Sequence, residues 1–171
     1  QLATLALFTV ALAEHRGCID AQKRKNLCQL LLEVPAYISE CLKLDDRLQA
    51  LAHNLMHSRD MLYIGRGTSY AIAMEGALKM KEISYIHAEA YAAGELKHGP
   101  IALIDEHVPV IVLAPSDHLF EKTTSNLQEA AARGGKIVLL SDAKGIAAMG
   151  EVATASIELP EAPSFIAPLL Y

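Results

Sequence analysis

The sequence predicts an α/β domain, in which a doubly wound, five-stranded parallel sheet follows an N-terminal helical leader. Five short apolar runs begin near residues 61, 85, 109, 136 and 154. Stretches with helical punctuation separate most of these runs. Continuous apolar strands that alternate with helices are typical of a parallel sheet covered on both faces. Such sheets bind ligands at the carboxyl ends of their strands.

Each element of the predicted sheet follows from its own run. The strands are expected at Met61–Gly65, Tyr85–Glu89, Pro109–Pro115, Lys136–Asp142 and Thr154–Pro160. The helices between them are expected at Thr68–Ser84, Leu119–Arg133 and Ala143–Glu151.

Residues 1–58 contain helical signals and no strand signal. The apolar run Leu2–Ala13 ends before Gly17, Asp20 can cap a second helix, and Pro35 can begin a third. We expect this leader to pack on the α/β unit at residues 59–171 rather than to form a domain of its own. The chain stops just after the apolar stretch 165–170. We therefore expect a piece of a longer polypeptide, with the α/β domain truncated at its C-terminus.

Composition excludes several classes of protein. Apolar residues make up 52% of the 171 residues, which excludes disorder. The net charge of −5 and the lack of a basic stripe argue against a nucleic-acid partner. The run Leu2–Ala13 is much shorter than the ~20 residues of a membrane span, so no membrane association is expected. Cys18, Cys28 and Cys41 suit neither a disulfide framework nor a zinc site, and we expect free thiols in the cytoplasm and no metal.

A glycine-containing loop, Gly65–Tyr70, follows the first predicted strand. Glycines let backbone N–H groups approach an anion, and a helix N-terminus favours negative charge, so Gly67, Thr68 and Ser69 form a weak phosphate-site pattern. Tyr70 stands where a dinucleotide fingerprint needs a third glycine. The alternative is an ordinary strand-to-helix turn.

The helix that follows carries Glu75, Lys79 and Glu82 on one face. A carboxylate held near an ammonium in a partly dry cleft can move a proton. The small and apolar residues beside this face predict that the helix is largely buried. The alternative is a solvated row of ion pairs, which would be structural only.

A third polar segment, Glu89–Pro100, places four polar or charged groups in one connection. His98 is the group that titrates near neutral pH. His87 lies in strand context and is expected to be structural. The remaining histidines are expected to be surface or packing residues, and no pair of histidines has metal spacing.

Three motifs together resemble the glucosamine-6-phosphate synthase family, also called glutamine–fructose-6-phosphate aminotransferase (isomerizing). They are Gly65-Arg66-Gly67, the helix segment Glu75–Ile83, and Ala93-Gly94-Glu95-Leu96-Lys97-His98-Gly99-Pro100. The resemblance covers nearly the whole chain and is to the second of the family's two sugar isomerase (SIS) subdomains. It implies a flavodoxin-like SIS fold, a cytoplasmic homodimer and no cofactor.

The resemblance also implies a reaction and a role for three residues. Fructose 6-phosphate and ammonia released from glutamine give glucosamine 6-phosphate, the start of UDP-N-acetylglucosamine synthesis. Glu82 matches the carboxylate that moves the proton between C1 and C2, and Lys79 matches the lysine beside it. His98 matches the histidine that assists ring opening in the active site of the neighbouring subunit.

The same resemblance assigns other parts of the enzyme to sequence outside these residues. These parts are the glutaminase domain, the first SIS subdomain with its main phosphate loops, and a C-terminal lysine that forms a Schiff base with the sugar. The Gly65–Tyr70 loop is then expected to be a remnant of a phosphate loop, and the fragment alone is expected to be inactive. The alternative function is a non-catalytic regulatory module that binds a sugar phosphate.

Overall fold

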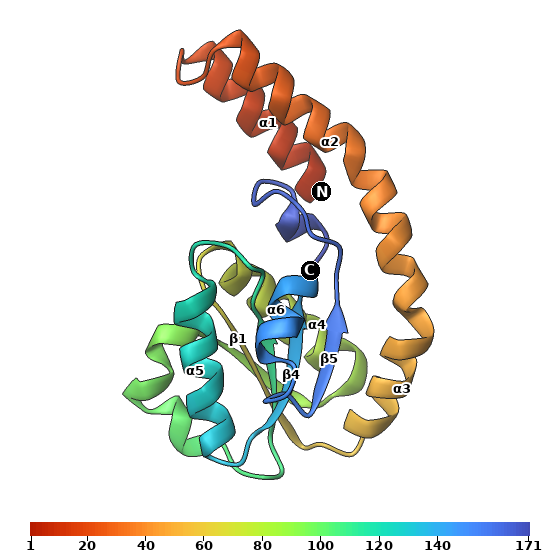
Figure 1. The fold of residues 1–171 in the computed structure, drawn as a ribbon, viewed down its shortest axis with the longest axis vertical. Helices are drawn as coiled ribbons and strands as arrows, with labels where there is room; N and C mark the ends of the chain where they lie inside the picture. The colour runs from red at the N-terminus through yellow and green to blue at the C-terminus, as the bar shows by residue number, and fades with distance from the viewer.

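The computed structural model describes residues 1–171 and contains one five-stranded sheet (Figure 1). Its strands are β1 (Asp60–Gly65), β2 (His87–Ala92), β3 (Pro109–Leu113), β4 (Lys136–Ser141) and β5 (Ala155–Glu158). All neighbouring strands are parallel, in the order β2-β1-β3-β4-β5. The predicted doubly wound parallel sheet is confirmed, with the strand order of flavodoxin-like folds.

Three helices and two short 3₁₀ turns connect the strands. They are α4 (Thr68–Ser84), α5 (Phe120–Ala132), α6 (Ala143–Met149), η2 (Ala93–His98) and η3 (Pro100–Leu103). Helix α4 has the bounds that the sequence predicted. Strand β2 begins two residues later than predicted, because Tyr85 adopts a left-handed conformation (φ 61°). Its N–H donates to the carbonyl of Lys81, so Tyr85 ends the helix instead of beginning the strand.

The sheet separates two apolar layers. Leu62 and Ile64 face a cluster that includes Leu127 of α5, whereas Met61 and Tyr63 face a cluster that includes α4 residues. Successive strand residues point to opposite faces, so the continuous apolar strand β1 supplies both layers.

Helix α4 lies unusually close to β1. A Cβ atom on Gly76 would lie 3.0 Å from the Tyr63 ring, so glycine permits the close approach. Burial raises the pKa of the Tyr63 hydroxyl to about 12, which keeps this phenol neutral.

The first helices extend beyond the α/β unit. Helix α1 (Leu2–His15) and the first half of α2 (Ala21–Cys41) project past the carboxyl ends of the strands, whereas α3 (Asp45–Leu55) runs beside the sheet (Figure 1). Leu51 and Leu55 of α3 pack against the core. The division at residue 58 stays a prediction, with α3 as the leader segment in contact with the core.

The sequence predicted that Leu2–Ala13 is buried. Within this chain, Val10 is the one buried residue of α1. Large apolar side chains of α1 are exposed, with Phe8 at 63%. The exposed set is Leu2, Leu5, Leu7, Phe8 and Leu12. No helix of the chain is both long enough and apolar enough to span a membrane.

Two local predictions for the leader have different outcomes. Asp20 caps α2 as expected, since its Oδ1 accepts the N–H of Lys23 at 2.6 Å. The prediction that Pro35 begins a helix is wrong, because Pro35 lies inside α2. Proline removes one helical hydrogen bond. Pro35 and its neighbour Ala36 are exposed, so water can satisfy a carbonyl left free on this side of the helix.

Candidate functional site

A small pocket lies at the carboxyl edge of the sheet, where ligands bind in folds of this class. Its wall combines the start of α4 with the segments after β3 and β4 and the C-terminal segment. Residues in the wall include Thr68, Ser69, Ser116, Asp117, Asp142 and Tyr171.

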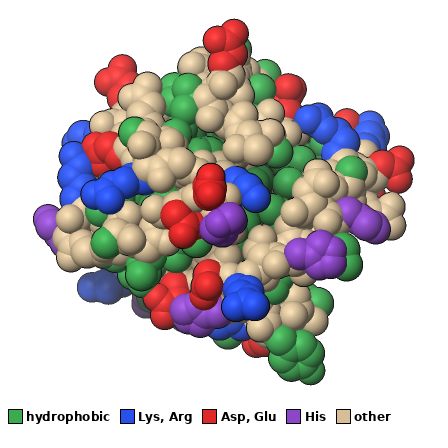
Figure 2. Space-filling view, turned by 90° about the horizontal axis from the view of Figure 1, so that it is seen from below, with side chains coloured by type: hydrophobic (Ala, Val, Ile, Leu, Met, Phe, Trp, Pro, Cys, Tyr) green, Lys and Arg blue, Asp and Glu red, His purple; other side chains and the backbone are tan.

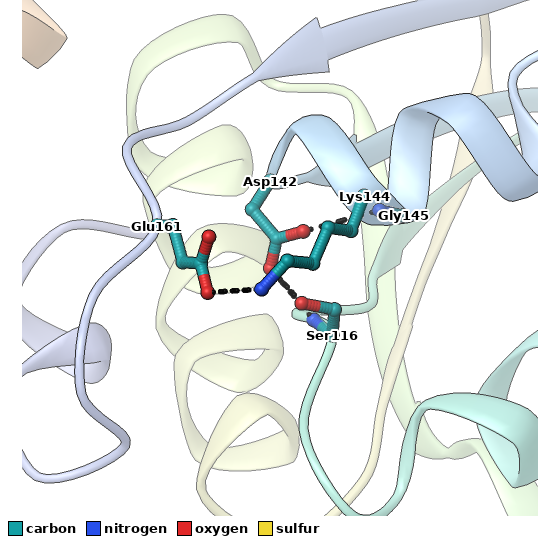
Figure 3. Close-up of polar contacts among 5 residues, drawn as sticks. All are labelled: Ser116, Asp142, Lys144, Gly145 and Glu161. Carbon is teal, nitrogen blue, oxygen red and sulfur yellow. Dashed lines mark hydrogen bonds and ion pairs between the residues drawn. The ribbon is translucent and has the colours of Figure 1, made fainter.

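Asp142 organises this pocket (Figure 3). Its Oδ2 accepts both the N–H and the hydroxyl of Ser116, at 2.8 and 2.7 Å, and its Oδ1 accepts the N–H of Gly145 at 3.1 Å. One carboxylate therefore joins the segment after β3 to the first turn of α6. Burial raises the pKa of Asp142, but the hydrogen bonds from Ser116 and Gly145 outweigh burial and lower it below its ordinary value.

The pocket contains Thr68 and Ser69 but has a poor environment for phosphate. The N–H of Ser69 donates to Arg66, and that of Tyr70 donates to Gly67, so both are occupied by the turn itself. The wall carries three carboxylates, from Asp117, Asp142 and Glu161. Glu161 is paired with Lys144 at 2.5 Å (Figure 3). A phosphate dianion would be repelled by the remaining acidic groups.

Gly67 has a conformational reason to be glycine. Its φ of 55° and ψ of −128° suit glycine, and a Cβ there would lie 3.0 Å from Leu119 Cδ1. The loop contacts favour the alternative of a strand-to-helix turn, and phosphate binding by Gly67, Thr68 and Ser69 stays a prediction.

Helix α4 brings Glu75, Lys79 and Glu82 together as predicted. Lys79 Nζ lies 2.7 Å from Glu82 Oε2 and 3.7 Å from Glu75 Oε1. The hydrogen bond from Lys79 to Glu82 raises the pKa of the lysine, so its ammonium stays charged. Half of each side chain is exposed, 51% for both Lys79 and Glu82, so this face is not largely buried within the chain as the sequence suggested. Burial in α4 is confined to Ser69, Ala73 and Ala77, which face the sheet.

His98 ends the 3₁₀ turn η2, just beyond the carboxyl end of β2. Its Nδ1 lies 2.7 Å from Glu95 Oε2, and 72% of its side chain is exposed. This imidazole therefore stands on the outside of the molecule, with a single polar partner from its own turn. His87, expected to be structural, pairs with Asp60 at 3.0 Å across β1 and β2.

No hydrogen bond or ion pair joins Glu82 to His98 within one chain, and α4 packs on one face of the sheet while η2 packs on the other. Fourteen residues separate Thr68 from Glu82 along α4, which is about 21 Å at the helical rise of 1.5 Å per residue. Glu82 therefore lies near the amino edge of the sheet. Figure 2 shows this edge from below, where acidic, basic and histidine side chains gather in the middle of the face.

Sequence reasoning missed a polar network at the carboxyl edge. Arg66 Nη2 donates to Asn126 Oδ1 at 2.8 Å, and Asn126 Nδ2 donates to Glu129 Oε2 at 3.2 Å. Glu129 in turn pairs with Lys97 at 2.8 Å. Arg66 and Lys97 lie far from their partners in the sequence, so no local spacing could have indicated these two contacts. No group of three or more histidine, cysteine or acidic residues is placed to hold a metal ion.

The fold and the motifs at its edges define the class of this protein. The model of the SIS domain family matches residues 54–170. The chain therefore belongs to the SIS domain family, and the first matched residues lie in α3.

More specific similarity covers the whole chain. Proteins named glutamine–fructose-6-phosphate aminotransferase [isomerizing] are 57% identical over all 171 residues in Brucella abortus and 52% identical in Zymomonas mobilis. The chain spans 28% of the length of these relatives.

Solved structures give the same grouping. The C-terminal domain of glucosamine-fructose-6-phosphate aminotransferase from Francisella tularensis has a TM-score of 0.88 and 40% identity, covering 95% of this chain and 45% of that one. The sugar isomerase domain of an RpiR transcription factor from Sphaerobacter thermophilus has a TM-score of 0.66. Its 16% identity, with 77% of this chain and 74% of that one covered, shows the fold alone.

The Asp142 network predicts a pH-dependent loss of stability in Asp142→Asn. An amide keeps one acceptor oxygen but turns an NH₂ group toward N–H or O–H donors that the carboxylate now satisfies. We expect a loss of about 1–3 kcal/mol in the free energy of unfolding at pH 7. Urea unfolding at several pH values measures it.

The pH dependence has a fixed direction. The folded-state pKa of Asp142 lies below its ordinary value of 3.8. Its stabilisation is therefore present above pH 3.8 and is lost as the pH falls through the folded-state pKa. The difference between wild type and Asp142→Asn should shrink in that acidic range. The exposed control Glu151→Gln should change stability by less than about 0.5 kcal/mol, and an equally small change in Asp142→Asn would contradict the assignment.

Proposed function

We propose that these residues form the second SIS subdomain of a glutamine–fructose-6-phosphate aminotransferase. The full protein would convert fructose 6-phosphate and glutamine-derived ammonia to glucosamine 6-phosphate, for amino sugar synthesis. The observation that carries the proposal is identity of 52–57% over the full length of this chain to proteins of that name. The glutaminase domain and the first SIS subdomain would belong to the remainder of the full-length chain.

The geometry of α4 supports a proton-transfer role for Glu82. Isomerisation moves a proton between C1 and C2, which requires a base at the carbon. Lys79, hydrogen-bonded to Glu82 at 2.7 Å, would fix the orientation of this carboxylate. Glu82 would accept the proton from one carbon and return it to the other.

The position of His98 supports an active site shared between subunits. Glu82 belongs to α4 and His98 to η2, which pack on opposite faces of one sheet, and the side chain of His98 points outward with 72% exposed. A histidine of this kind can serve the active site of a neighbouring subunit, where it would assist opening of the sugar ring. The proposed assembly is a cytoplasmic homodimer.

A Glu82→Gln variant of the full-length enzyme tests the catalytic assignment. Glutamine is isosteric and keeps an acceptor for Lys79, but it cannot take up a proton. We expect glucosamine 6-phosphate formation to fall about 10²–10⁴-fold, with folding and glutamine hydrolysis nearly unchanged. Coupled assays of both activities on one preparation give the measurement.

Glu75→Gln is the matched control. Glu75 lies on the same helix, at 3.7 Å from the same lysine, and is similarly exposed. It should keep near-normal turnover. If Glu82→Gln also kept near-normal turnover, Glu82 would not be the base, and its contact with Lys79 would be a structural ion pair.

The isolated 171-residue chain should not form glucosamine 6-phosphate. It spans 28% of its relatives, and the proposed ammonia source and main phosphate loops belong to the remainder. Incubation with fructose 6-phosphate and ammonium measures this activity. Turnover clearly above the buffer background would contradict the proposed division of the site.

Helix α1 predicts self-association. Each exposed leucine or phenylalanine side chain gains about 1.5–3 kcal/mol when it is fully buried, and α1 exposes five such side chains. We expect sedimentation of the chain to give a dimer or larger species. The double substitution Leu5→Gln/Phe8→Gln should shift the equilibrium toward monomer, while Lys25→Gln on the exposed surface of α2 should not. A wild-type monomer at high protein concentration would count against the homodimer.

A further inference from the structure

The guanidinium of Arg66 packs closely against Gly94. A Cβ atom on Gly94 would stand 2.9 Å from Nη2, 3.1 Å from Nη1 and 3.2 Å from Cζ of Arg66. Three nearly equal distances mean that the face of the guanidinium, rather than one nitrogen, meets the chain. Gly94 is the second residue of η2, and His98 is its last. Glycine at position 94 thus permits an approach that any side chain would prevent.

A side chain of α5 holds Arg66 in place. Its Nη2 donates to Asn126 Oδ1 at 2.8 Å, and Asn126 is 4% exposed. The loop that carries Arg66 is tightly turned, and a Cβ on Gly65 would lie 2.6 Å from the backbone oxygen of Ser69. Arg66 Nε is buried without a hydrogen-bond partner. One N–H donor of the guanidinium is therefore left without an acceptor, while the group keeps its contacts with Asn126 and Gly94.

The hydrogen-bond network that holds Arg66 also reaches the C-terminal end of η2. Asn126 Nδ2 donates to Glu129, and Glu129 pairs with Lys97, the residue before His98. The hydrogen bond from Lys97 holds the pKa of Glu129 below its usual range, so this pair stays charged. Between the two ends, Leu96 is fully buried in the core. The 3₁₀ turn is thus fixed at Gly94, Leu96 and Lys97.

His98 depends on this support, because it makes no polar contact outside its own turn. Its one polar partner, Glu95, belongs to the same turn, and the next residue, Gly99, has a φ of 139°, a backbone conformation that favours glycine. The location of the imidazole is set by η2 alone.

We propose that Arg66 is a positioning residue. Through its contact with Gly94 it fixes the position of the turn Ala93–His98 relative to the sheet, and so places the His98 imidazole for the neighbouring active site. This inference rests on the proposed function and deepens it. Lysine could not replace arginine here, since an ammonium lacks the planar face that meets Gly94 and the fork that reaches Asn126. Arg66 does not touch substrate in this scheme and acts only through His98.

The test uses the full-length enzyme with Arg66→Met, His98→Ala and the double variant. A histidine displaced by about 1 Å can cost up to about 10²-fold, so kcat for glucosamine 6-phosphate formation should fall roughly 10–100-fold in Arg66→Met. KM for fructose 6-phosphate should stay within about threefold, because Arg66 holds no substrate. Arg66→Met should cause no further loss in the His98→Ala background. Arg133→Met, at the exposed end of α5, is the matched control and should keep wild-type kinetics.

Amide hydrogen exchange supplies a readout that is independent of catalysis. Backbone amides of residues 94–98 should exchange at least about tenfold faster in Arg66→Met, with the strands of the sheet unchanged. If Arg66→Met does not fold, Arg66→Lys keeps the stem and charge and should show the same changes to a smaller degree.

The outcomes separate the two proposals. Wild-type turnover and exchange in the Arg66 variants, together with a slow His98→Ala enzyme, would overturn the role of Arg66 and leave the proposed function standing. Additive losses in the double variant would also overturn it, because Arg66 would then act apart from His98. Wild-type turnover by His98→Ala would overturn both.

Discussion

The crossover from β1 through α4 to β2 is the constraint on which the rest of this structure depends. Two adjacent parallel strands can be joined only if the chain returns to the edge where it started. Helix α4 makes that return, so its first residues lie beside the carboxyl-edge pocket and its last residues near the amino edge. Strand β2 then carries the chain forward again to His98. The order of elements alone therefore places the start of α4 at the carboxyl edge and Glu82 near the amino edge.

This separation determines what one chain can do with the proposed substrate. The start of α4 and Glu82 are about 21 Å apart along the helix, far more than a six-carbon sugar phosphate spans. Phosphate held by Thr68 and Ser69 would keep the sugar away from Glu82. The carboxylates of Asp117 and Asp142 make the same pocket unfavourable for a dianion. Both observations favour a phosphate site elsewhere in the proposed enzyme, with the Gly65–Tyr70 loop as a structural turn.

Local signals predicted much of the fold but little of the network around the site. The bounds of α4 follow from Gly65 and Gly67 before it and from the end of its helical pattern, and the grouping of Lys79 with Glu82 follows from helical spacing. The start of β2 was misplaced because the left-handed conformation of Tyr85 has no glycine to mark it. The joining of Arg66 to Asn126 depends on how α5 docks on the sheet, which no short spacing encodes.

The half-exposed state of Glu82 matters for the proposed chemistry, because water surrounds its contact with Lys79 in a single chain. The attraction between this carboxylate and the ammonium of Lys79 is weakened by water and becomes stronger where water is excluded. The end of α4 exposes Leu78, Ile83 and Tyr85 around this pair, at 43%, 78% and 92%. In the proposed enzyme, burial of these apolar side chains by the rest of the protein would also remove water from Glu82. The surface that favours assembly would then also hold Glu82 more firmly beside Lys79, and a dissociated chain would lack both the partner subunit's His98 and the dry carboxylate.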